Sequence, residues 1–381
     1  MKMIYFDNSA TTRIKPEEVY DAFNYYVRDI GVSPGRGSYA LGITASRMLY
    51  QSRKAVAKFF GIDNSNNVVF TKNSTEAINL FFNGYLNTGD HVLISPFEHN
   101  AVLRPLHSLS NSNVISYDIL PESVIYNNQN DLTKYIKPNT KLLVIMLASN
   151  LTGQIVFNRE LAKIAHEHGV KVFVDSSQGA GKKLINMNED GIDFLAFTGH
   201  KDMLSLPGVG GLCSISDLII KPLIQGGTGI FGDSYVNPKS YPDAYEAGTL
   251  NMPAIWALKC AIEYLEKNYR RINEIETDLT NYCISQLVAI NGVETYNIDK
   301  QRVSTFCFNI EGILSNTVVE ELDKYGICVR GGIHCAILAH QSLGTVKTGA
   351  VRISLNYFNT KAEIDYFIEK VEEIKNARSI L

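Results

Sequence analysis

The pattern of apolar and polar positions changes along this chain. Between residues 67 and 216, short apolar runs rich in β-branched residues alternate with stretches whose apolar positions recur at helical spacing. We interpret the runs as strands. Strands separated by helices predict an α/β fold, in which a mostly parallel sheet is covered by helices on both faces. The predicted strands comprise residues 68–70, 91–95, 142–148, 170–174 and 194–197.

After about residue 249 the pattern becomes a long helical stretch, followed by strands and a closing helix with one apolar face. We interpret this part as a smaller α+β domain packed on the large one. The predicted division gives residues 14–250 to the large domain and 251–381 to the small one. Residues 1–13 are predicted to form an N-terminal segment near the active site. The predicted elements are a helix over residues 254–269 and beyond, strands over 305–310 and 351–355, and a helix face carrying Ile364, Phe367, Ile368 and Val371.

A glycine-rich, poorly patterned segment, residues 225–249, precedes the small domain. It is too long for a simple connector, and long irregular segments of compact proteins are usually functional. We therefore expect a functional or interface loop here.

The composition restricts the kind of protein. The 381 residues are 45% hydrophobic, with a formal net charge of −3 and no long run of Lys or Arg, so we expect a small-molecule substrate, no nucleic-acid partner and no membrane. The most apolar stretch, residues 142–148, is far shorter than the ~20 residues that span a bilayer, and the start of the chain lacks an apolar signal core. Six cysteines without a CxxC pair fit reduced thiols. We expect a cytoplasmic protein.

The strongest local signal is the run Thr198, Gly199, His200 and Lys201, which follows the predicted strand 194–197. A lysine at the end of a buried strand can be held partly desolvated, where its amine forms an imine with an aldehyde. Taken alone, however, a lysine just after a strand is more often a solvated loop residue.

A second signal is Asp175, which follows the predicted strand 170–174 and opens a turn containing Gln178. An acidic residue at the carboxyl end of a parallel strand lies on the ligand-binding edge of such a sheet. Its carboxylate can pair there with a protonated pyridine nitrogen. The alternative is that Asp175 only caps the turn.

A third signal is the segment 71–77 before an amphipathic helix, because it contains the small hydroxyl residues Ser74 and Thr75. Such residues at a helix start expose free backbone N–H groups and form a natural phosphate cup. Asn73 and Glu76 equally fit an ordinary capping box.

Together these signals resemble the class V aminotransferase group of fold-type I pyridoxal-phosphate (PLP) enzymes, and within it the cysteine desulfurase and selenocysteine lyase family. The resemblance spans nearly the whole chain and its motifs follow the order of the family. It therefore implies the fold-type I transferase fold and PLP as the cofactor; we predict no metal site. Further matching motifs are residues 5–12, 98–101, 148–153, 246–249, 330–336 and 351–354.

The resemblance assigns a role to each cofactor residue. Lys201 would be the imine lysine and Asp175 would face the pyridine nitrogen. Gln178 would reach the phenolic oxygen of the ring, and His99 would stack on the ring face as a catalytic residue. Asn150 would bond near that oxygen or the substrate carboxylate. Standing alone, His99 could equally be a satisfied histidine near a strand end.

The phosphate would be held by Ser74, Thr75, Thr198 and His200, joined by Thr249 of the neighbouring subunit. This last contact implies an obligate homodimer. It also gives the long segment 225–249 a function.

The resemblance also implies substrate contacts. Arg352 would grip the α-carboxylate with its planar guanidinium, and Asn8, Asn150 and Arg330 would complete the substrate site. The alternative for Arg352 is a surface ion-pair partner.

Cys335 decides what happens to the bound amino acid. In the family a cysteine at this position attacks the sulfur of the substrate, becomes a persulfide and releases alanine. The neighbouring Arg330 and His334 could favour its thiolate; the alternative is a buried structural thiol. The other five cysteines are interpreted as structural. The chain departs from the family pattern at Ile333 and Asn100, each of which replaces a histidine.

We therefore predict a PLP-dependent cysteine desulfurase or selenocysteine lyase that converts L-cysteine or L-selenocysteine to L-alanine. The short stretch between Cys335 and Arg352 favours a compact loop, the arrangement of family members that use a separate sulfur-acceptor protein, and the family implies a role in iron–sulfur cluster assembly. The alternative is another class V enzyme, an aminotransferase, epimerase or β-lyase, in which Cys335 is dispensable. A cofactor-binding regulator without turnover is disfavoured because no basic patch occurs.

Overall fold

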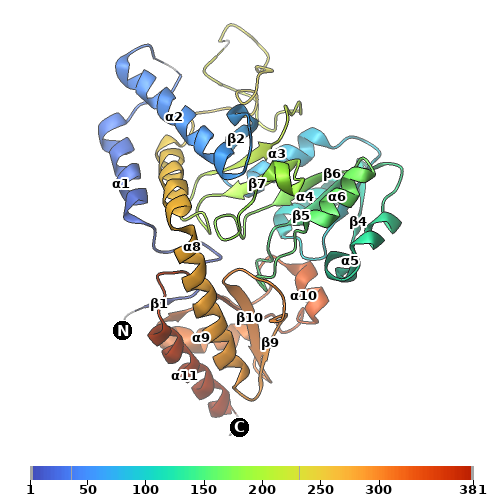
Figure 1. Ribbon diagram of the computed structural model, residues 1–381, viewed down its shortest axis with the longest axis vertical. Coiled ribbons are helices and arrows are strands. Elements are labelled where there is room, and N and C mark those ends of the chain that lie inside the picture. The colour runs from blue at the N-terminus through green and yellow to red at the C-terminus, as the bar shows by residue number, and fades with distance from the viewer. Residues whose placement is uncertain (1–2, 36, 231, 379–381) are drawn as a thin grey trace.

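The computed structural model describes residues 3–35, 37–230 and 232–378. It has a large lobe and a small lobe, and the helix α8 (Met252–Val288) runs from one into the other (Figure 1). The outer ends of the predicted domains, residues 1–2 and 379–381, lie outside the described residues.

The large lobe is built on a seven-stranded sheet with the strand order β2-β8-β7-β6-β5-β3-β4. The strands from β7 to β4 run parallel, and only β8 is antiparallel to its neighbours β2 and β7. The mostly parallel sheet is therefore confirmed. The strands are β2 (Val68–Thr71), β3 (Asp90–Ile94), β4 (Ile115–Ile119), β5 (Thr140–Met146), β6 (Lys171–Asp175), β7 (Phe194–Thr198) and β8 (Gly210–Ser214).

Helices cover both faces of this sheet. Along β5, Leu142 and Val144 pack in the core formed with α3 and α4, whereas Leu143 and Ile145 pack in the core formed with α2, α6 and α8. Alternating side chains of a strand point to opposite faces, so a strand buried on both sides reads as a continuous apolar run. The helices are α1 (Glu17–Tyr25), α2 (Ala40–Phe59), α3 (Ser74–Tyr85), α4 (Asn100–Asn111), α5 (Glu122–Tyr126), α6 (Arg159–Glu167) and α7 (Met187–Asp190).

The small lobe has its own core beneath an antiparallel sheet of order β12-β10-β9. A parallel pair of short strands, β1 (Ile4–Tyr5) and β11 (Ile327–Cys328), joins the N-terminal segment to this lobe. Ile364, Phe367 and Val371 of the closing helix are fully buried, as its apolar face predicts. The elements are β9 (Val293–Thr295), β10 (Thr305–Ile310), β12 (Val351–Ser354), α9 (Ser315–Lys324), α10 (Ile337–Leu343) and α11 (Lys361–Arg378).

Helix α8 contributes to both cores. Most of its buried residues up to Ile272 pack in the core of the large lobe, Ala257 and Ala261 pack against α1, and Leu279, Cys283 and Leu287 pack in the core of the small lobe. The division after residue 250 stays a prediction, and the helix that follows it belongs to both lobes.

Two irregular segments lie near the edges of the lobes. The described residues between β8 and α8 form turns without a helix or strand, as the glycine-rich pattern predicts. The N-terminal segment leaves the small lobe and reaches the large one, where the Thr12 hydroxyl donates a 2.7 Å hydrogen bond to the Lys201 carbonyl.

In the described part of the chain, no helix has the length and apolarity to cross a membrane.

Candidate active site

A cavity of about 210 Å³ opens where three parallel strands end. Met146, Asp175 and Thr198 are the last residues of β5, β6 and β7, and all three line it. The carboxyl edge of a parallel sheet is the usual ligand site of such folds. The cavity brings together the predicted residues Ser74, Thr75, His99, Asn150, Asp175, Gln178, Thr198, His200 and Lys201.

Lys201 presents its amine to this cavity from the turn after β7. Burial lowers the pKa of the Lys201 amine; Asp175 and Asp202 oppose this effect, whereas Arg352 and Arg330 add to it. A lowered lysine pKa increases the fraction of neutral amine, which is the nucleophilic form. The position therefore suits imine formation.

His99 lies at the N-cap of α4, and its Nδ1 accepts a 3.0 Å hydrogen bond from the backbone N–H of Ala101. Because Nδ1 is an acceptor, the proton of the neutral ring lies on Nε2. Burial, followed by the positive charge of Lys201, lowers the pKa of His99 to about 4. The ring is thus neutral at physiological pH, which suits a residue that stacks on an aromatic ligand.

Asp175 is buried and held by the turn that follows it. Its Oδ1 accepts hydrogen bonds from the backbone N–H of Ser177, at 2.9 Å, and from the Ser177 hydroxyl. The same hydroxyl lies 2.7 Å from the Ser74 hydroxyl at the start of α3. Ser177 therefore links the carboxylate to the predicted phosphate cup, although the sequence predicted no role for it beyond the turn.

The predicted capping box at the cup is present in one direction only, because Glu76 Oε2 accepts from the backbone N–H of Lys72, at 2.6 Å, and not from that of Asn73. The Asn73 side chain accepts from the backbone N–H of Glu76 at 2.9 Å, and α3 begins at Ser74. The cap and the cup are therefore compatible, because Ser74 and Thr75 still line the cavity.

Three buried polar atoms of the cavity lining lack a hydrogen-bond partner within the described residues: Gln178 Oε1, Asn150 Oδ1 and Thr198 Oγ1. The amide nitrogens are engaged, because Gln178 donates to the Ser9 carbonyl and Asn150 to the His334 carbonyl, both at 2.8 Å. Buried polar atoms are nearly always paired. A small polar ligand therefore fits the lining, and Lys201 and Asp175 match the two ends of a pyridine aldehyde such as PLP.

Other predicted site residues, Asn8, Thr249, Arg330, Cys335 and Arg352, are not among the described residues that line this cavity. The side-chain nitrogen of Asn8 donates to the Ser354 carbonyl at 2.9 Å. The side chain of Arg330 is exposed, and its positive charge acts on both His99 and Lys201.

Arg352 is only 2% exposed and is anchored on two sides. Its Nη1 donates to the Asn150 carbonyl at 2.9 Å, and its Nη2 pairs with the Asp7 carboxylate at 2.5 Å. Its Nε has no partner within the described residues. A buried, ion-paired guanidinium next to Asn150 replaces the surface alternative, and Asp7 is a partner that the sequence analysis missed.

Cys335 lies in a loop that two hydrogen bonds hold beside the cavity. The backbone N–H of Asn100 donates to the Cys335 carbonyl at 2.9 Å, and the Asn150 side chain holds the preceding carbonyl of His334. Both His334 and Cys335 have φ = +55°. A non-glycine residue in this region costs about 1–3 kcal/mol, and such residues cluster at active sites.

His334 does not have the charge that the sequence analysis considered for it. Burial, followed by the charge of Arg352, lowers the pKa of His334 to about 3. Its Nε2 lies 3.0 Å from the Arg330 carbonyl, and its ring stacks on that of His340. A neutral His334 cannot stabilise a thiolate by its charge.

Of the remaining cysteines, Cys213, Cys283 and Cys307 are buried in hydrophobic cores, whereas Cys260 and Cys328 are partly exposed. Burial raises the pKa of the Cys213, Cys283, Cys307, Cys260 and Cys328 thiols. A raised pKa disfavours the nucleophilic thiolate.

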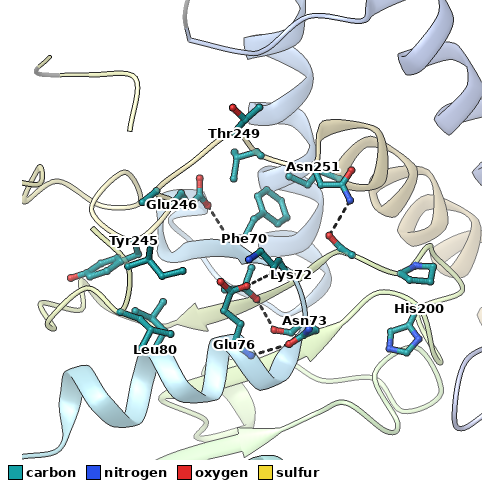
Figure 2. A pocket seen from close by; sticks show the side chains of 18 residues that line it. Phe70, Lys72, Asn73, Glu76, Leu80, His200, Tyr245, Glu246, Thr249 and Asn251 are labelled. Carbon is teal, nitrogen blue, oxygen red and sulfur yellow. Dashed lines mark hydrogen bonds between the residues drawn. The ribbon is translucent and has the colours of Figure 1, made fainter. Parts of the chain in front are cut away.

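Thr249 lines a second cavity of about 550 Å³, which Figure 2 shows together with Asn73 and His200. The two cavities share Asn73 and His200. Beside Thr249, the Glu246 carboxylate accepts from the backbone N–H of Phe70 and forms a buried two-bond ion pair with Arg53. The end of the long segment is thus fixed against β2.

Comparisons with known proteins show the family of this chain. Residues 4–367 match the family model described as aminotransferase class-V. The chain is 32% identical to a probable cysteine desulfurase of Methanothermobacter thermautotrophicus, over 97% of this chain and 94% of that protein. It is 31% identical to a probable cysteine desulfurase of Halalkalibacterium halodurans, over 98% and 93%.

Solved structures extend the similarity to the fold. The apo structure of a cysteine desulfurase from Thermococcus onnurineus has a TM-score of 0.90 and 31% identity, covering 99% of this chain and 95% of that chain. The Escherichia coli cysteine desulfurase CsdA in its S-sulfonic acid form has a TM-score of 0.86 and 28% identity, covering 97% and 94%. The expected fold is confirmed, and the chain belongs to the class-V aminotransferase family.

Proposed function

We propose that this enzyme is a PLP-dependent cysteine desulfurase that transfers the sulfur of L-cysteine to Cys335 and releases L-alanine. The observation that carries the proposal is the position of the Cys335 loop. The loop is hydrogen-bonded both to the start of α4, next to His99, and to Asn150, which lines the cavity of Lys201. The similarity to cysteine desulfurases over nearly the whole chain supports it.

The cavity residues would hold the cofactor as follows. Lys201 would bind it covalently, and Asp175 would face the ring nitrogen. Ser74, Thr75, Thr198 and His200 would bind the phosphate, with the free backbone N–H groups at the start of α3. When bound, PLP supplies an electron sink that makes the α-proton of an amino acid acidic.

The residues of this chain then divide the work of positioning and proton transfer. Arg352 binds the substrate carboxylate with the part of its guanidinium that Asp7 and Asn150 leave free. Neutral His99 would cover one face of the cofactor ring, and its side chain would exclude water from that face. Lys201 Nζ takes the α-proton, because burial lowers its pKa and so increases the fraction of its basic form.

Cys335 performs the sulfur transfer. Its Sγ forms a bond to the sulfur of the substrate while the Cβ–S bond of the substrate breaks. Cysteine and the Cys335 thiol thereby give alanine and a Cys335 persulfide, with no external oxidant or reductant. The protons lost from the substrate are returned to its carbon atoms, first at Cβ and then at Cα.

A coupled assay tests this function. Alanine and sulfide, or alanine and selenide, would be measured with L-cysteine and L-selenocysteine as substrates in the presence of a thiol reductant. Equal amounts of alanine and sulfide from cysteine support desulfuration. Turnover of selenocysteine alone would assign a selenocysteine lyase, and transamination without sulfide release would assign another class V activity, in which Cys335 is dispensable.

The same proposal includes a homodimer in which Thr249 reaches the phosphate of the partner. Thr249 lies outside the cavity of its own chain, in the 550 Å³ cavity that adjoins the cup. Large apolar side chains are exposed at the start and on the surface of α2 and between β8 and α8, which fits a covered surface: Tyr39, Ile43, Tyr50, Ile219, Tyr235 and Val236. Light scattering should give twice 42.4 kDa, and an active monomer would contradict it.

The proposal further includes a separate sulfur-acceptor protein. Helix α10 begins at Ile337, two residues after Cys335, so the cysteine has little chain on which to move. The sulfur must then be collected at the loop by a protein or thiol that reaches it. We place this reaction in the cytoplasm, in the supply of sulfur for iron–sulfur clusters; sulfide accumulation without any acceptor at the full rate would contradict the need for one.

A further inference from the structure

Three charged side chains form a buried cluster behind the active site. Lys182 Nζ lies 3.2 Å from Asp202 Oδ1 and 3.0 Å from Glu276 Oε2. The exposed fractions of the three side chains are 6%, 3% and 4%. Charged groups are rarely buried to this extent unless they are paired. Removing one of the three charges would therefore leave another buried without its partner.

On one side, the cluster holds the turns that carry active-site residues. Asp202 directly follows Lys201, and its Oδ2 accepts a 2.7 Å hydrogen bond from the backbone N–H of Gly179. Gly179 directly follows Gln178, which lines the cofactor cavity. One carboxylate therefore joins the Lys201 turn to the Gln178 turn.

On the other side, the cluster holds the small lobe. The Ser304 hydroxyl donates to Glu276 Oε2 at 2.9 Å, and the backbone N–H of Tyr357 donates to Glu276 Oε1 at 3.3 Å. Lys182 also donates to the Leu355 carbonyl at 3.3 Å. Leu355 lies three residues after Arg352, directly beyond β12.

The cluster lies at the joint between the lobes. Glu276 is on α8 between Ile272, which packs in the core of the large lobe, and Leu279, which packs in the core of the small lobe. The helix thus changes packing partners around this residue, and Figure 1 shows α8 running from the large lobe into the small one. Lys182 and Glu276 also line a cavity of about 510 Å³ between the lobes, so apolar packing does not fill the joint here.

We propose that Lys182, Asp202 and Glu276 are positioning residues, which lock the small lobe and its Arg352 in register with Lys201. Apolar packing can slide, whereas ion pairs with several hydrogen bonds favour one relative arrangement. A buried polar cluster of this kind can specify an arrangement even where it adds little stability. The inference rests on the proposed function, because it assumes that Lys201 and Arg352 act on one substrate.

The charges within the cluster support this role. Burial alone would lower the pKa of Lys182, but Asp202 and Glu276 more than offset this effect and the pKa is raised. Lys182 therefore stays charged. Asp202 also acts on Lys201. The other charged or titratable neighbours of Lys201 are Asp175, Arg352, Arg330, His99 and His200, and Glu276 is not among them.

The different neighbours of Asp202 and Glu276 give a test with two readouts on the PLP-loaded enzyme. Glu276→Gln should raise KM for cysteine about tenfold, with a smaller change in kcat, because the substrate carboxylate site is displaced. The pH midpoint of the visible absorption of bound PLP should stay at the parent value in this variant. Asp202→Asn should move that midpoint to lower pH, because a negative charge that favours the protonated Lys201 nitrogen is lost.

Conservative replacements and a matched control complete the design. Lys182→Met should raise KM for cysteine as Glu276→Gln does. Lys182→Arg keeps the positive charge and should raise KM less than Lys182→Met. If Lys182→Met does not fold, the Glu276→Gln result decides. Glu263→Gln is the control, because Glu263 is on the same helix in an exposed pair with Lys259, and it should change neither readout.

Parent KM values in folded Glu276→Gln, or an unchanged midpoint in Asp202→Asn, would overturn the proposal. Failure of the proposed function is distinguishable from this outcome. In that case the parent enzyme itself would show no visible band with PLP or no alanine from cysteine.

Discussion

The backbone N–H of Asn100 donates a 2.9 Å hydrogen bond to the carbonyl of Cys335. Asn100 is the first residue of α4, whose initial N–H groups have no partner within the helix. The cysteine loop thus satisfies a helix end and is fixed next to His99. The bond uses the backbone N–H of residue 100, so it does not require the histidine that the family pattern has at this position in place of Asn100.

The first prediction removes this bond without disturbing the helix. Asn100→Pro lacks the N–H, but proline is favoured at the first helical position, and His99 has the extended conformation (φ −70°, ψ 155°) that proline requires before it. Loss of about 0.5–1.5 kcal/mol should slow desulfuration roughly two- to tenfold, with the PLP band retained. Asn100→Ala keeps the N–H and should be the faster of the two; if both variants are equally slow, the bond has no such role.

The second prediction concerns the ion pair between Arg352 and Asp7. Arg352→Lys replaces a planar fork by a point charge and should lower kcat/KM for cysteine by about tenfold or more. PLP binding should be unaffected, because Arg352 is not in the described lining of the cofactor cavity. Steady-state kinetics and the visible spectrum measure the two effects. Arg159→Lys is the control, because Arg159 pairs with Asp190 and neither residue lines the cofactor cavity. Parent kinetics in Arg352→Lys would exclude carboxylate binding.

The third prediction is a pH dependence of stability caused by Glu98. Burial raises the pKa of the Glu98 carboxyl from 4.5 to about 8, although Ser95 and the backbone of Met146 donate hydrogen bonds to Oε1. Between these pH values the unfolded chain has lost the proton and the folded chain keeps it, so rising pH favours unfolding. The contribution of Glu98 to stability is therefore fully present below about pH 4.5, and it decreases as the pH rises to about 8.

Glu98→Gln should remove this dependence, because the amide does not titrate. Urea unfolding of parent and variant at pH 5, 6, 7 and 8 measures the difference in free energy of unfolding. The stability of the variant relative to the parent should rise steadily over this range. A constant difference would contradict the raised pKa.

The fourth prediction tests whether Thr249 acts in the partner subunit. Lys201→Ala and Thr249→Ala variants should each have low activity alone. In a mixed dimer, one site combines an intact Lys201 with the intact Thr249 of the other chain and should regain activity. If Thr249 serves its own chain, no site in the mixed dimer is intact, and mixing would restore nothing.

Much of the cofactor site was predictable, because its residues follow strong local patterns. Asp175 and Thr198 end two apolar strands, and Ser74 begins an amphipathic helix. The ends of neighbouring parallel strands and the helix starts that face them meet at one edge. The order of strands and helices along the chain was therefore sufficient to predict that these residues lie close together.

Other features depend on contacts between distant parts of the chain. Asp7 pairs with Arg352, and Lys182 pairs with Glu276; no local pattern connects these positions. Strand β8 was not predicted because it begins with two glycines, which weaken a strand signal. At Gly211 a Cβ would lie 2.6 Å from the Phe197 ring and the Val69 carbonyl, so the neighbouring strands require a glycine there. The charge of His334 depends on its burial, which its position in the sequence does not reveal.

The most direct test of the central claim is the fate of sulfur in a single turnover. The PLP-loaded enzyme would be mixed with one equivalent of L-cysteine without reductant, and the Cys335 peptide analysed by mass spectrometry together with the released alanine. The account predicts one extra sulfur atom on Cys335 for each alanine, and, from Cys335→Ala, a normal PLP band but no alanine. Release of alanine from cysteine by Cys335→Ala at the parent rate would contradict it.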